Sequence, residues 1–211
     1  MKKILLAVPK GRILDELNPL LSRIAIIPEA DFFDESSRKL IFTTNHKNLE
    51  IVKVRSFDVA TFVKFGGADM GICGADVLAE FNSAEIFSLL DLKIGACRLS
   101  IAGKKSLQLN LDKISHIRIA TKYSEIAKNY FSQFAIQAEI IKLNGAIEIA
   151  SKLNLCDFIL DLVSSGKTLA ENEMVEIKKI LDVTSHLIVN RTSFKTANYE
   201  INQLIKIFDV V

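Results

Sequence analysis

The sequence predicts an α/β fold with two lobes. Short apolar runs alternate with amphipathic helical patterns along almost the whole chain of 211 residues, which is typical of sheets whose strands are joined by crossover helices. The pattern restarts after residues 92–103, where a second series of strands and helices begins. We therefore expect residues 1–95 together with 181–211 to form a first lobe and residues 96–180 to form a second.

The first lobe is expected to open with a strand and to receive the last strand and helix of the chain. Its apolar runs predict strands over residues 3–8, 39–44, 49–54, 69–73 and 186–190. Apolar residues at helical spacing predict helices over 11–24, 57–65 and 192–208, and a short helix that ends near Phe81. Ser56 is suited to cap the second of these helices, and Gly66 and Gly67 to end it.

The second lobe repeats the alternation with its own elements. Strands are predicted over residues 116–121, 138–143 and 157–163, and helices over 124–134 and 145–153. The polar stretch at 104–116 is interpreted as an insertion or an edge of this lobe. The residues that follow its last strand, 169–174, are predicted to begin a further helix.

Composition limits the kind of partner. The net charge of +2 argues against the broad basic surface of a nucleic-acid-binding protein. The cysteines Cys73, Cys97 and Cys156 lie far apart in apolar surroundings and are expected to be buried thiols. The start of the chain does not match a signal peptide, and no apolar run approaches the ~20 residues of a membrane span. We therefore expect a cytoplasmic protein that binds neither nucleic acid nor membrane.

The most informative stretch is SSGKT at residues 164–168, directly after the last strand of the second lobe. Small residues allow the backbone N–H groups of this turn to converge on a phosphate, at the edge of the sheet where open α/β folds bind their ligands. A helix that follows would add positive charge at its start. The alternative for this loop taken alone is an ordinary polar turn.

An aspartate separates this loop from the phosphate loop of ATPases. That loop requires G-x-x-x-x-G-K-[ST], and Asp161 occupies the position of the first glycine. A carboxylate there would repel a polyphosphate, whereas it can accept hydrogen bonds from the hydroxyl groups of a phosphorylated sugar. Asp157, four residues earlier, is expected on the same side of the strand because side chains repeat with period two.

The whole stretch E-x5-NLCDFILDLVSSGKTL, residues 148–169, resembles the phosphoribosyl-diphosphate (PRPP) motif of the ATP phosphoribosyltransferases. The resemblance extends along the chain through LAVPKGR, VRSFDVATFVKFGGADMGICGADVL, CRLSIAG, RIATKY and HLIVN. It implies a fold similar to the type II periplasmic binding proteins, with mixed sheets and a cleft between the lobes. Asn154 and Cys156 depart from the family pattern, which usually has glycine and a small residue such as alanine there. We expect a slightly altered turn and intact binding.

The resemblance also implies a reaction. ATP, through N1 of adenine, displaces pyrophosphate from C1 of the PRPP ribose in the first step of histidine biosynthesis. The transition state resembles an oxocarbenium ion, so fixed cations and a Mg²⁺ carried mainly by the diphosphate would supply much of the catalysis. The sequence does not indicate which residues contact the metal, because His46, His116 and His186 are scattered without metal-ligand spacing.

Site residues follow from the motifs and from this resemblance. Lys10 and Arg12 follow the first strand, with Gly11 permitting close backbone approach; Arg55 follows another strand and Arg38 precedes one. The alternative for these four basic residues is that they are solvated surface cations, and for Arg38 taken alone this alternative is favoured. The expected catalytic residues are Lys10, Arg38 and Arg55. The expected ATP-binding residues are Lys10, Gly11, Arg12, Gly74, Asp76 and Glu148. The expected PRPP-binding residues are Asp157, Asp161, Ser164, Ser165, Gly166, Lys167 and Thr168.

The length of the chain resembles the short form of this family, which lacks a C-terminal regulatory domain. That resemblance implies a homodimer of catalytic chains that assembles with a regulatory subunit similar to histidyl-tRNA synthetase. Two other functions stay open from the residues alone. One is a non-catalytic, two-lobed ligand-binding protein. A secreted form of such a protein would need a signal peptide, which the start of this chain does not match. The other is a phosphate-loop ATPase, which the missing glycine disfavours.

Overall fold

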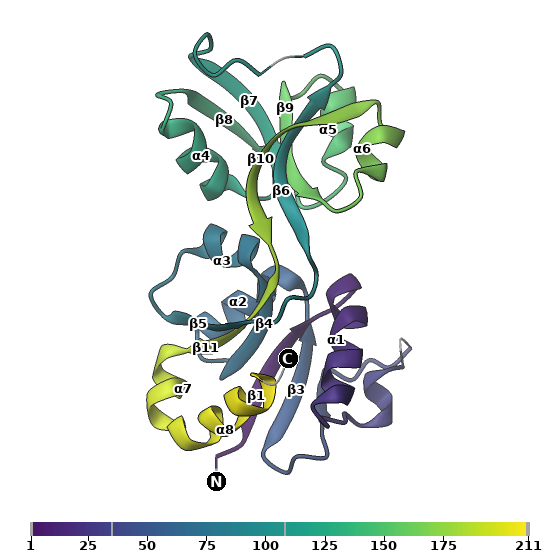
Figure 1. The fold of residues 1–211 in the computed structure, drawn as a ribbon, viewed down its shortest axis with the longest axis vertical. Coiled ribbons are helices and arrows are strands. Elements are labelled where there is room, and N and C mark those ends of the chain that lie inside the picture. The colour runs from purple at the N-terminus through teal and green to yellow at the C-terminus, as the bar shows by residue number, and fades with distance from the viewer. Residues whose placement is uncertain (1, 35, 108, 210–211) are drawn as a thin grey trace. The chain divides into compact units, whose positions relative to one another are not determined.

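The computed structural model of the chain describes residues 2–34, 36–107 and 109–209. Contacts divide the chain into two units, the first made of Met1–Gly95 with Thr184–Val211 and the second of Ala96–Val183 (Figure 1). The chain returns to the first unit at Thr184 rather than at residue 181, because the last strand of the second unit stays paired as far as Val183. Within the described residues we find no helix with the length and apolar content needed to cross a bilayer.

The first unit is built on a mixed sheet with strand order β2-β3-β1-β4-β11-β5. Strand β1 pairs in parallel with β3 and β4, while β2, β11 and β5 run antiparallel to their neighbours. The strands are β1 (Ile4–Pro9), β2 (Ile41–Thr43), β3 (Leu49–Val54), β4 (Met70–Gly74), β5 (Ile86–Asp91) and β11 (Ser185–Asn190). The helices are α1 (Arg12–Arg23), α2 (Ser56–Lys64), α3 (Ala75–Phe81), α7 (Arg191–Thr196) and α8 (Asn198–Phe208), with a 3₁₀ turn at Ala30–Phe32.

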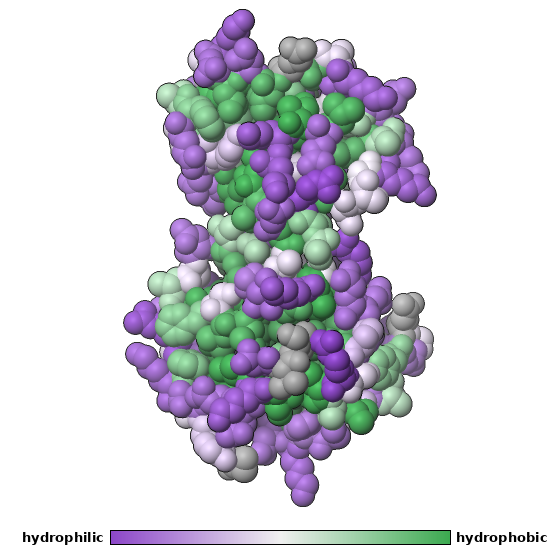
Figure 2. All heavy atoms as spheres, viewed as in Figure 1, coloured by the Kyte–Doolittle hydropathy of each residue, from purple (hydrophilic) through white to green (hydrophobic). Residues whose placement is uncertain are grey.

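Both faces of this sheet are buried, as the alternation along β1 shows. Leu6 and Val8 join a core that includes residues of α1 and α8, whereas Ala7 joins a second core with residues of α2 and α3. Period-two alternation therefore places α1 and α8 on one face and α2 and α3 on the other. In Figure 1 the yellow C-terminal helices accordingly lie in the same unit as the purple N-terminal strand. Hydrophilic side chains are distributed over the visible face of each unit in Figure 2.

The second unit has a mixed sheet of its own, with strand order β10-β6-β9-β7-β8. Strands β7, β8 and β9 are parallel, and β6 runs antiparallel to both β9 and β10. The strands are β6 (Cys97–Lys104), β7 (His116–Thr121), β8 (Gln137–Lys142), β9 (Phe158–Val163) and β10 (Met174–Val183). The helices are α4 (Ser124–Ser132), α5 (Glu148–Lys152) and α6 (Lys167–Glu171).

Several expectations about single elements and residues are corrected. Strands β5, β6 and β10 were not predicted. The helix expected from residue 169 starts earlier and is shorter than expected, since α6 spans Lys167–Glu171 and β10 starts at Met174. Ser56 does not cap α2, because it is the first helical residue and the extended Arg55 precedes it. The terminal helix breaks at Ala197, which has φ −126°. Cys97 is only partly buried, although Cys73 and Cys156 are buried thiols.

Candidate active site

The SSGKT turn joins the carboxyl end of β9 to α6. Both of its ends are fixed in the apolar core of the second unit, because Val163 and Leu169 are only 4% and 7% exposed and belong to the same cluster. Gly166, which precedes α6, has φ 79° and ψ 2°. Side chains rarely adopt this left-handed backbone, so the sharp turn depends on glycine.

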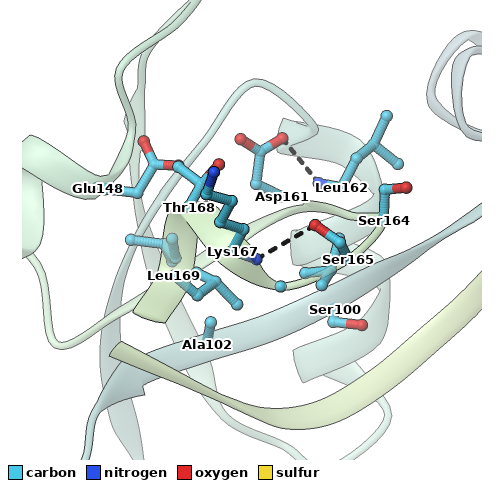
Figure 3. Close-up of a pocket in the computed structure, with 13 residues that line it drawn as sticks. Ser100, Ala102, Glu148, Asp161, Leu162, Ser164, Ser165, Lys167, Thr168 and Leu169 are labelled. Atoms are coloured by element: carbon cyan, nitrogen blue, oxygen red, sulfur yellow. Dashed lines mark hydrogen bonds between the residues drawn. The ribbon is translucent and has the colours of Figure 1, made fainter. Parts of the chain in front are cut away.

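A pocket of ≈ 160 Å³ opens at this turn and lies wholly within the second unit. Figure 3 shows the carboxylates of Glu148 and Asp161 together with Lys167 and Thr168 along one side of it. It is lined by Ser100, Ala102, Glu148, Ile159, Asp161, Leu162, Val163, Ser164, Ser165, Gly166, Lys167, Thr168 and Leu169. All the sequence-predicted residues of the SSGKT turn therefore line one pocket with two carboxylates.

The turn offers backbone donors to a ligand. The hydroxyl of Ser165 accepts the Lys167 N–H at 3.3 Å. In the part of the chain that the structure describes, the backbone N–H groups of Ser165 and Gly166 have no hydrogen-bond acceptor. Helix α6 has only five residues, so few peptide dipoles align and its charge at the N-terminus is smaller than the sequence pattern suggested. The amides of the turn itself are thus the main donors.

Asp161 lies in β9, directly opposite Ser100 of β6. Its Oδ1 accepts the N–H of Leu162 at 2.8 Å and lies 3.8 Å from Nζ of Lys122. The side chain remains 26% exposed. Its carboxylate is therefore accessible to a ligand while its position is fixed by the strand.

Asp157 is not brought to this pocket. It precedes β9 at the opposite end of the strand, and four residues of extended chain span roughly 13 Å. Its carboxylate accepts the Arg118 N–H at 2.8 Å and Nη2 of Arg118 at 3.0 Å. Partial burial raises the pKa of Asp157, but the hydrogen bonds from Arg118 outweigh burial and hold the pKa below its ordinary value. Period-two alternation relates the faces of a strand, but it does not bring residues at opposite ends of the strand to one site.

Glu148 is the first residue of α5 and lines the same pocket as Asp161. The sequence analysis listed Glu148 among the ATP-binding residues, with binding of ribose or of a metal-bound water as its other expected role. Its place in the pocket, within the expected second lobe, favours the second of these roles.

The predicted residues of the first unit gather at one edge of its sheet. Strands β1 and β3 are parallel and end together, with Pro9 opposite Val54. The Lys10 N–H donates to Val54 O at 2.8 Å, so Lys10 and Arg55 leave the sheet side by side. Gly11, with φ 85°, turns the chain into α1, and Nη2 of Arg12 donates to Gly95 O at 3.4 Å.

Arg38, Gly74 and Asp76 belong to the same region. Strand β2 is antiparallel to β3, and the Lys53 N–H donates to Leu40 O at 3.1 Å. The chain that precedes β2 therefore runs beside the end of β3, which brings Arg38 to the edge of the other cations. Gly74 ends β4, which is parallel to β1. Asp76 is only 4% exposed, in contrast to the exposed Lys10, Arg12, Arg38 and Arg55.

Three residues of the second unit were missed by the sequence analysis. Lys122 follows β7, which is parallel to β9, so its proximity to Asp161 could have been inferred from the meeting of parallel strand ends. Ser100 and Arg98 lie on β6, which pairs with β9 in antiparallel fashion. Their place beside the loop depends on a strand pairing that local periodicity does not reveal.

The donor set for metals is small. Within the described ranges, no group of three or more His, Cys, Asp or Glu residues could hold a metal ion. His46, His116 and His186 instead lie near Ala25 O, Glu139 and Ser88 respectively. Burial raises the pKa of the Cys73 and Cys156 thiols, so both favour the inert protonated form.

Comparison with known proteins identifies the family of this fold and loop. A family model described as ATP phosphoribosyltransferase matches residues 55–209. The chain belongs to the ATP phosphoribosyltransferase family. An ATP phosphoribosyltransferase of Paramagnetospirillum magneticum is 52% identical over 208 residues, which cover 98% of this chain and 95% of the relative. One from Rhodospirillum rubrum is 51% identical and is covered to 92%.

A solved structure supports the fold of this family member. The ATP phosphoribosyl transferase (HisG:HisZ) complex from Thermotoga maritima contains a chain similar to it, with a TM-score of 0.82 and 28% identity. The similarity covers 98% of this chain and 96% of the other. The expectation of a two-lobed α/β fold with mixed sheets is confirmed.

The two departures from the family pattern have a structural account. Asn154 has φ 56°, a conformation that glycine adopts freely and that asparagine tolerates better than most residues. Its side-chain oxygen accepts Nζ of Lys104 at 2.7 Å. Cys156 is 6% exposed and packs in the core that contains β9. Both residues are accommodated without a break in β9.

Proposed function

We propose that this chain catalyses the transfer of the phosphoribosyl group of PRPP to N1 of ATP, with release of pyrophosphate, as the first step of histidine biosynthesis. The N1 electron pair forms the new bond to C1 of the ribose, and the electrons of the broken C1–O bond leave on pyrophosphate. Membership of the family supports this reaction. The observation that assigns the reaction to particular residues is the pocket, in which two carboxylates adjoin the SSGKT turn of residues 164–168, hereafter the phosphate loop.

The pocket suits a phosphorylated pentose. Its ≈ 160 Å³ is below the ~300–1,000 Å³ of sites that enclose whole drug-sized ligands. In our proposal the N–H groups of Ser165 and Gly166 bind the 5-phosphate, and Asp161 accepts hydrogen bonds from the ribose hydroxyls. Glu148 lies beside the same ribose, rather than beside ATP. Lys167, whose side chain is 80% exposed, contributes long-range attraction more than a fixed contact.

The cations of the first unit are proposed to bind the triphosphate and the departing diphosphate. Lys10, Arg12, Arg38 and Arg55 are brought to one edge of the first sheet by the ends of β1 and β3 and the start of β2. Fixed positive charge placed where negative charge develops lowers the barrier without reorganisation of solvent. Lys122, 3.8 Å from Asp161, joins these candidates from the second unit.

The reaction is proposed to require Mg²⁺. The two pocket carboxylates, Glu148 and Asp161, fit the way in which Mg²⁺ is bound through one or two carboxylates together with substrate phosphates. Such an ion would spread the charge that builds on the leaving diphosphate.

A regulatory partner is also proposed. The similar structure from Thermotoga maritima is described as a HisG:HisZ complex. We infer that this chain is of the short form, and that a homodimer of it assembles with a partner of the HisZ type, similar to histidyl-tRNA synthetase.

The direct test is incubation of the purified chain with ATP, PRPP and Mg²⁺, with and without a HisZ-type partner. The ultraviolet absorbance should change as adenine becomes N1-substituted, and pyrophosphate should appear in equal amount. Omission of PRPP is the control. No absorbance change with the partner present would reject the proposed function.

A further inference from the structure

An ion pair between Arg98 and Glu176 lies beside the phosphate loop, and neither residue lines the pocket. Arg98 of β6 pairs with Val163, the last residue of β9. Nη1 of Arg98 donates to the backbone carbonyl of Ser164 at 3.0 Å. Arg98 is not among the residues that line the pocket. Arg98 thus contacts the first peptide of the loop without lining the pocket.

Glu176 of β10 holds this guanidinium. Nε of Arg98 donates to Oε1 and Oε2 of Glu176 at 2.7 and 2.9 Å, and Nη2 donates to Oε2. The guanidinium is a rigid planar fork, so a carboxylate bound along one edge determines where the remaining N–H groups point. Glu176 therefore directs Nη1 of Arg98 to the Ser164 carbonyl.

The same carboxylate fixes one wall of the pocket. The hydroxyl of Ser100, a fully buried residue that lines the pocket, donates to Oε1 of Glu176 at 2.7 Å. Ser100, Ser164 and Ser165 lie on the same side of the view in Figure 3. One ion pair thus orients both the loop and the wall beside it.

The carbonyl contact has a consequence for the loop amides. In a planar trans peptide the C=O and N–H groups point in opposite directions. With the Ser164 carbonyl bound to Arg98, the N–H of Ser165 must point away from Arg98. That N–H has no acceptor among the described residues. A donor that is oriented before the ligand arrives binds it with less loss of conformational freedom.

We propose that Arg98 and Glu176 are positioning residues that preorganise the phosphate loop for PRPP. This inference rests on the proposed function, because it assigns a role in binding the PRPP phosphate. The competing role is a structural link between β6 and β10. The side chains are 33% and 26% exposed, and an ion pair that is partly open to solvent contributes little to stability when its replacements keep polar groups in the same place. The fold should therefore tolerate their replacement.

The test compares Arg98→Lys with the wild-type chain. Lysine keeps the charge but cannot bind Glu176 and the Ser164 carbonyl at fixed angles. We expect the Kd and KM for PRPP to rise about tenfold, which corresponds to the loss of one charge-assisted hydrogen bond. The KM for ATP and the unfolding midpoint should stay close to the wild-type values. Glu139→Gln is the control, since Glu139 lies on β8, at the opposite edge of the sheet from β10, and its side chain is 58% exposed.

A double-mutant cycle separates positioning from stability. If Glu176 acts through Arg98, then Glu176→Gln should weaken PRPP binding alone but add little to Arg98→Lys. Wild-type PRPP affinity in Arg98→Lys would overturn the inference, and so would an equal loss for ATP and PRPP. Failure of the wild-type chain itself to bind PRPP would instead reject the proposed function and this inference with it.

Discussion

At the residue scale, the phosphate loop depends on the left-handed backbone of Gly166. A Cβ added there would have open space, with Val163 Cγ1 4.0 Å away, but φ is 79°. A left-handed residue with a side chain costs roughly 1–2 kcal/mol, and valine is among the least tolerant. We expect Gly166→Val to fold and to bind PRPP at least ~10-fold more weakly, because the loop relaxes out of its binding conformation.

Calorimetric titration with PRPP and thermal unfolding measure these two effects. Gly145→Val is a suitable control, since a Cβ at Gly145 also meets nothing within 4 Å and its φ lies outside the left-handed region. Unchanged PRPP affinity in Gly166→Val would show that the ligand does not need the turn in this form.

A second residue-scale prediction separates the two aspartates of the motif. Asp161→Asn keeps the shape but removes the charge that strengthens hydrogen bonds to ribose hydroxyls, each worth about 1.5–3 kcal/mol. PRPP affinity should fall by roughly 10- to 150-fold. Asp157→Asn, at the other end of β9, should leave PRPP affinity unchanged. Isothermal titration of both variants with PRPP tests this prediction. A larger loss of PRPP affinity in Asp157→Asn than in Asp161→Asn would refute our assignment.

The sequence predicted a turn over residues 164–168 at the end of a strand, and the structure has it, because that pattern is local. Ser164, Ser165 and Gly166 follow one buried strand directly, and the spacing to Asp161 distinguishes the loop from that of an ATPase. The pairing of Arg98 with Glu176 joins residues 78 apart in the chain. It depends on which strands lie side by side, a property of the whole sheet that local patterns do not contain.

At the element scale, the strands that escaped prediction are β5, β6 and β10, and each has a partner with which its pairing is irregular. Strand β10 has register shifts between Glu176 and Lys178 and between Lys179 and Leu181, and β5 pairs with β11 across another shift. A bulge adds a residue and breaks the period-two alternation by which strands are recognised. Regular strands such as β1 and β9 were predicted to within a residue or two.

Asp69 joins three elements of the first unit and gives a prediction about pH. Its carboxylate accepts Nζ of Lys2 at 2.8 Å, the N–H of Leu5 in β1 at 3.0 Å and the hydroxyl of Ser193 in α7 at 2.7 Å. Burial raises the pKa of Asp69, but these three hydrogen bonds outweigh burial and lower the pKa below 3.8. The folded state therefore binds the proton less tightly than the unfolded chain.

Stability from Asp69 is present above the unfolded pKa and is lost as pH falls through the lower folded pKa. We expect Asp69→Asn to destabilise the protein by about 1–3 kcal/mol at pH 7. The difference in free energy of unfolding between wild type and variant should narrow below pH 3.8, the ordinary pKa of an aspartate. Denaturant unfolding at several pH values measures this difference. Asp112→Asn, at an exposed loop residue, is the control, and a constant difference across pH would contradict the prediction.

At the scale of the whole molecule, the proposed chemistry divides between the two units. The phosphate loop and its carboxylates belong to residues 96–183, whereas Lys10, Arg38 and Arg55 belong to the first unit. If the second unit binds the sugar and the first stabilises the leaving diphosphate, then replacing these basic residues should slow the chemical step more than it weakens PRPP binding. The sequence indicated both groups of residues, because each follows or precedes a predicted strand.

Arg55→Ala tests this division of roles. Removal of one group that stabilises developing charge typically lowers the rate by about 10²–10³-fold. We expect a fall of that order in the single-turnover rate, with a smaller change in the Kd for ATP. Arg23→Ala, at an exposed position in the last turn of α1, serves as the matched control. A wild-type single-turnover rate in Arg55→Ala would remove Arg55 from the catalytic role.

The most direct measurement is a crystal structure of the chain with PRPP and Mg²⁺ bound. Our account predicts the 5-phosphate within hydrogen-bond distance of the Ser165 and Gly166 N–H groups, and the ribose hydroxyls on Asp161. Electron density for PRPP elsewhere, with nothing bound at residues 164–168, would contradict it.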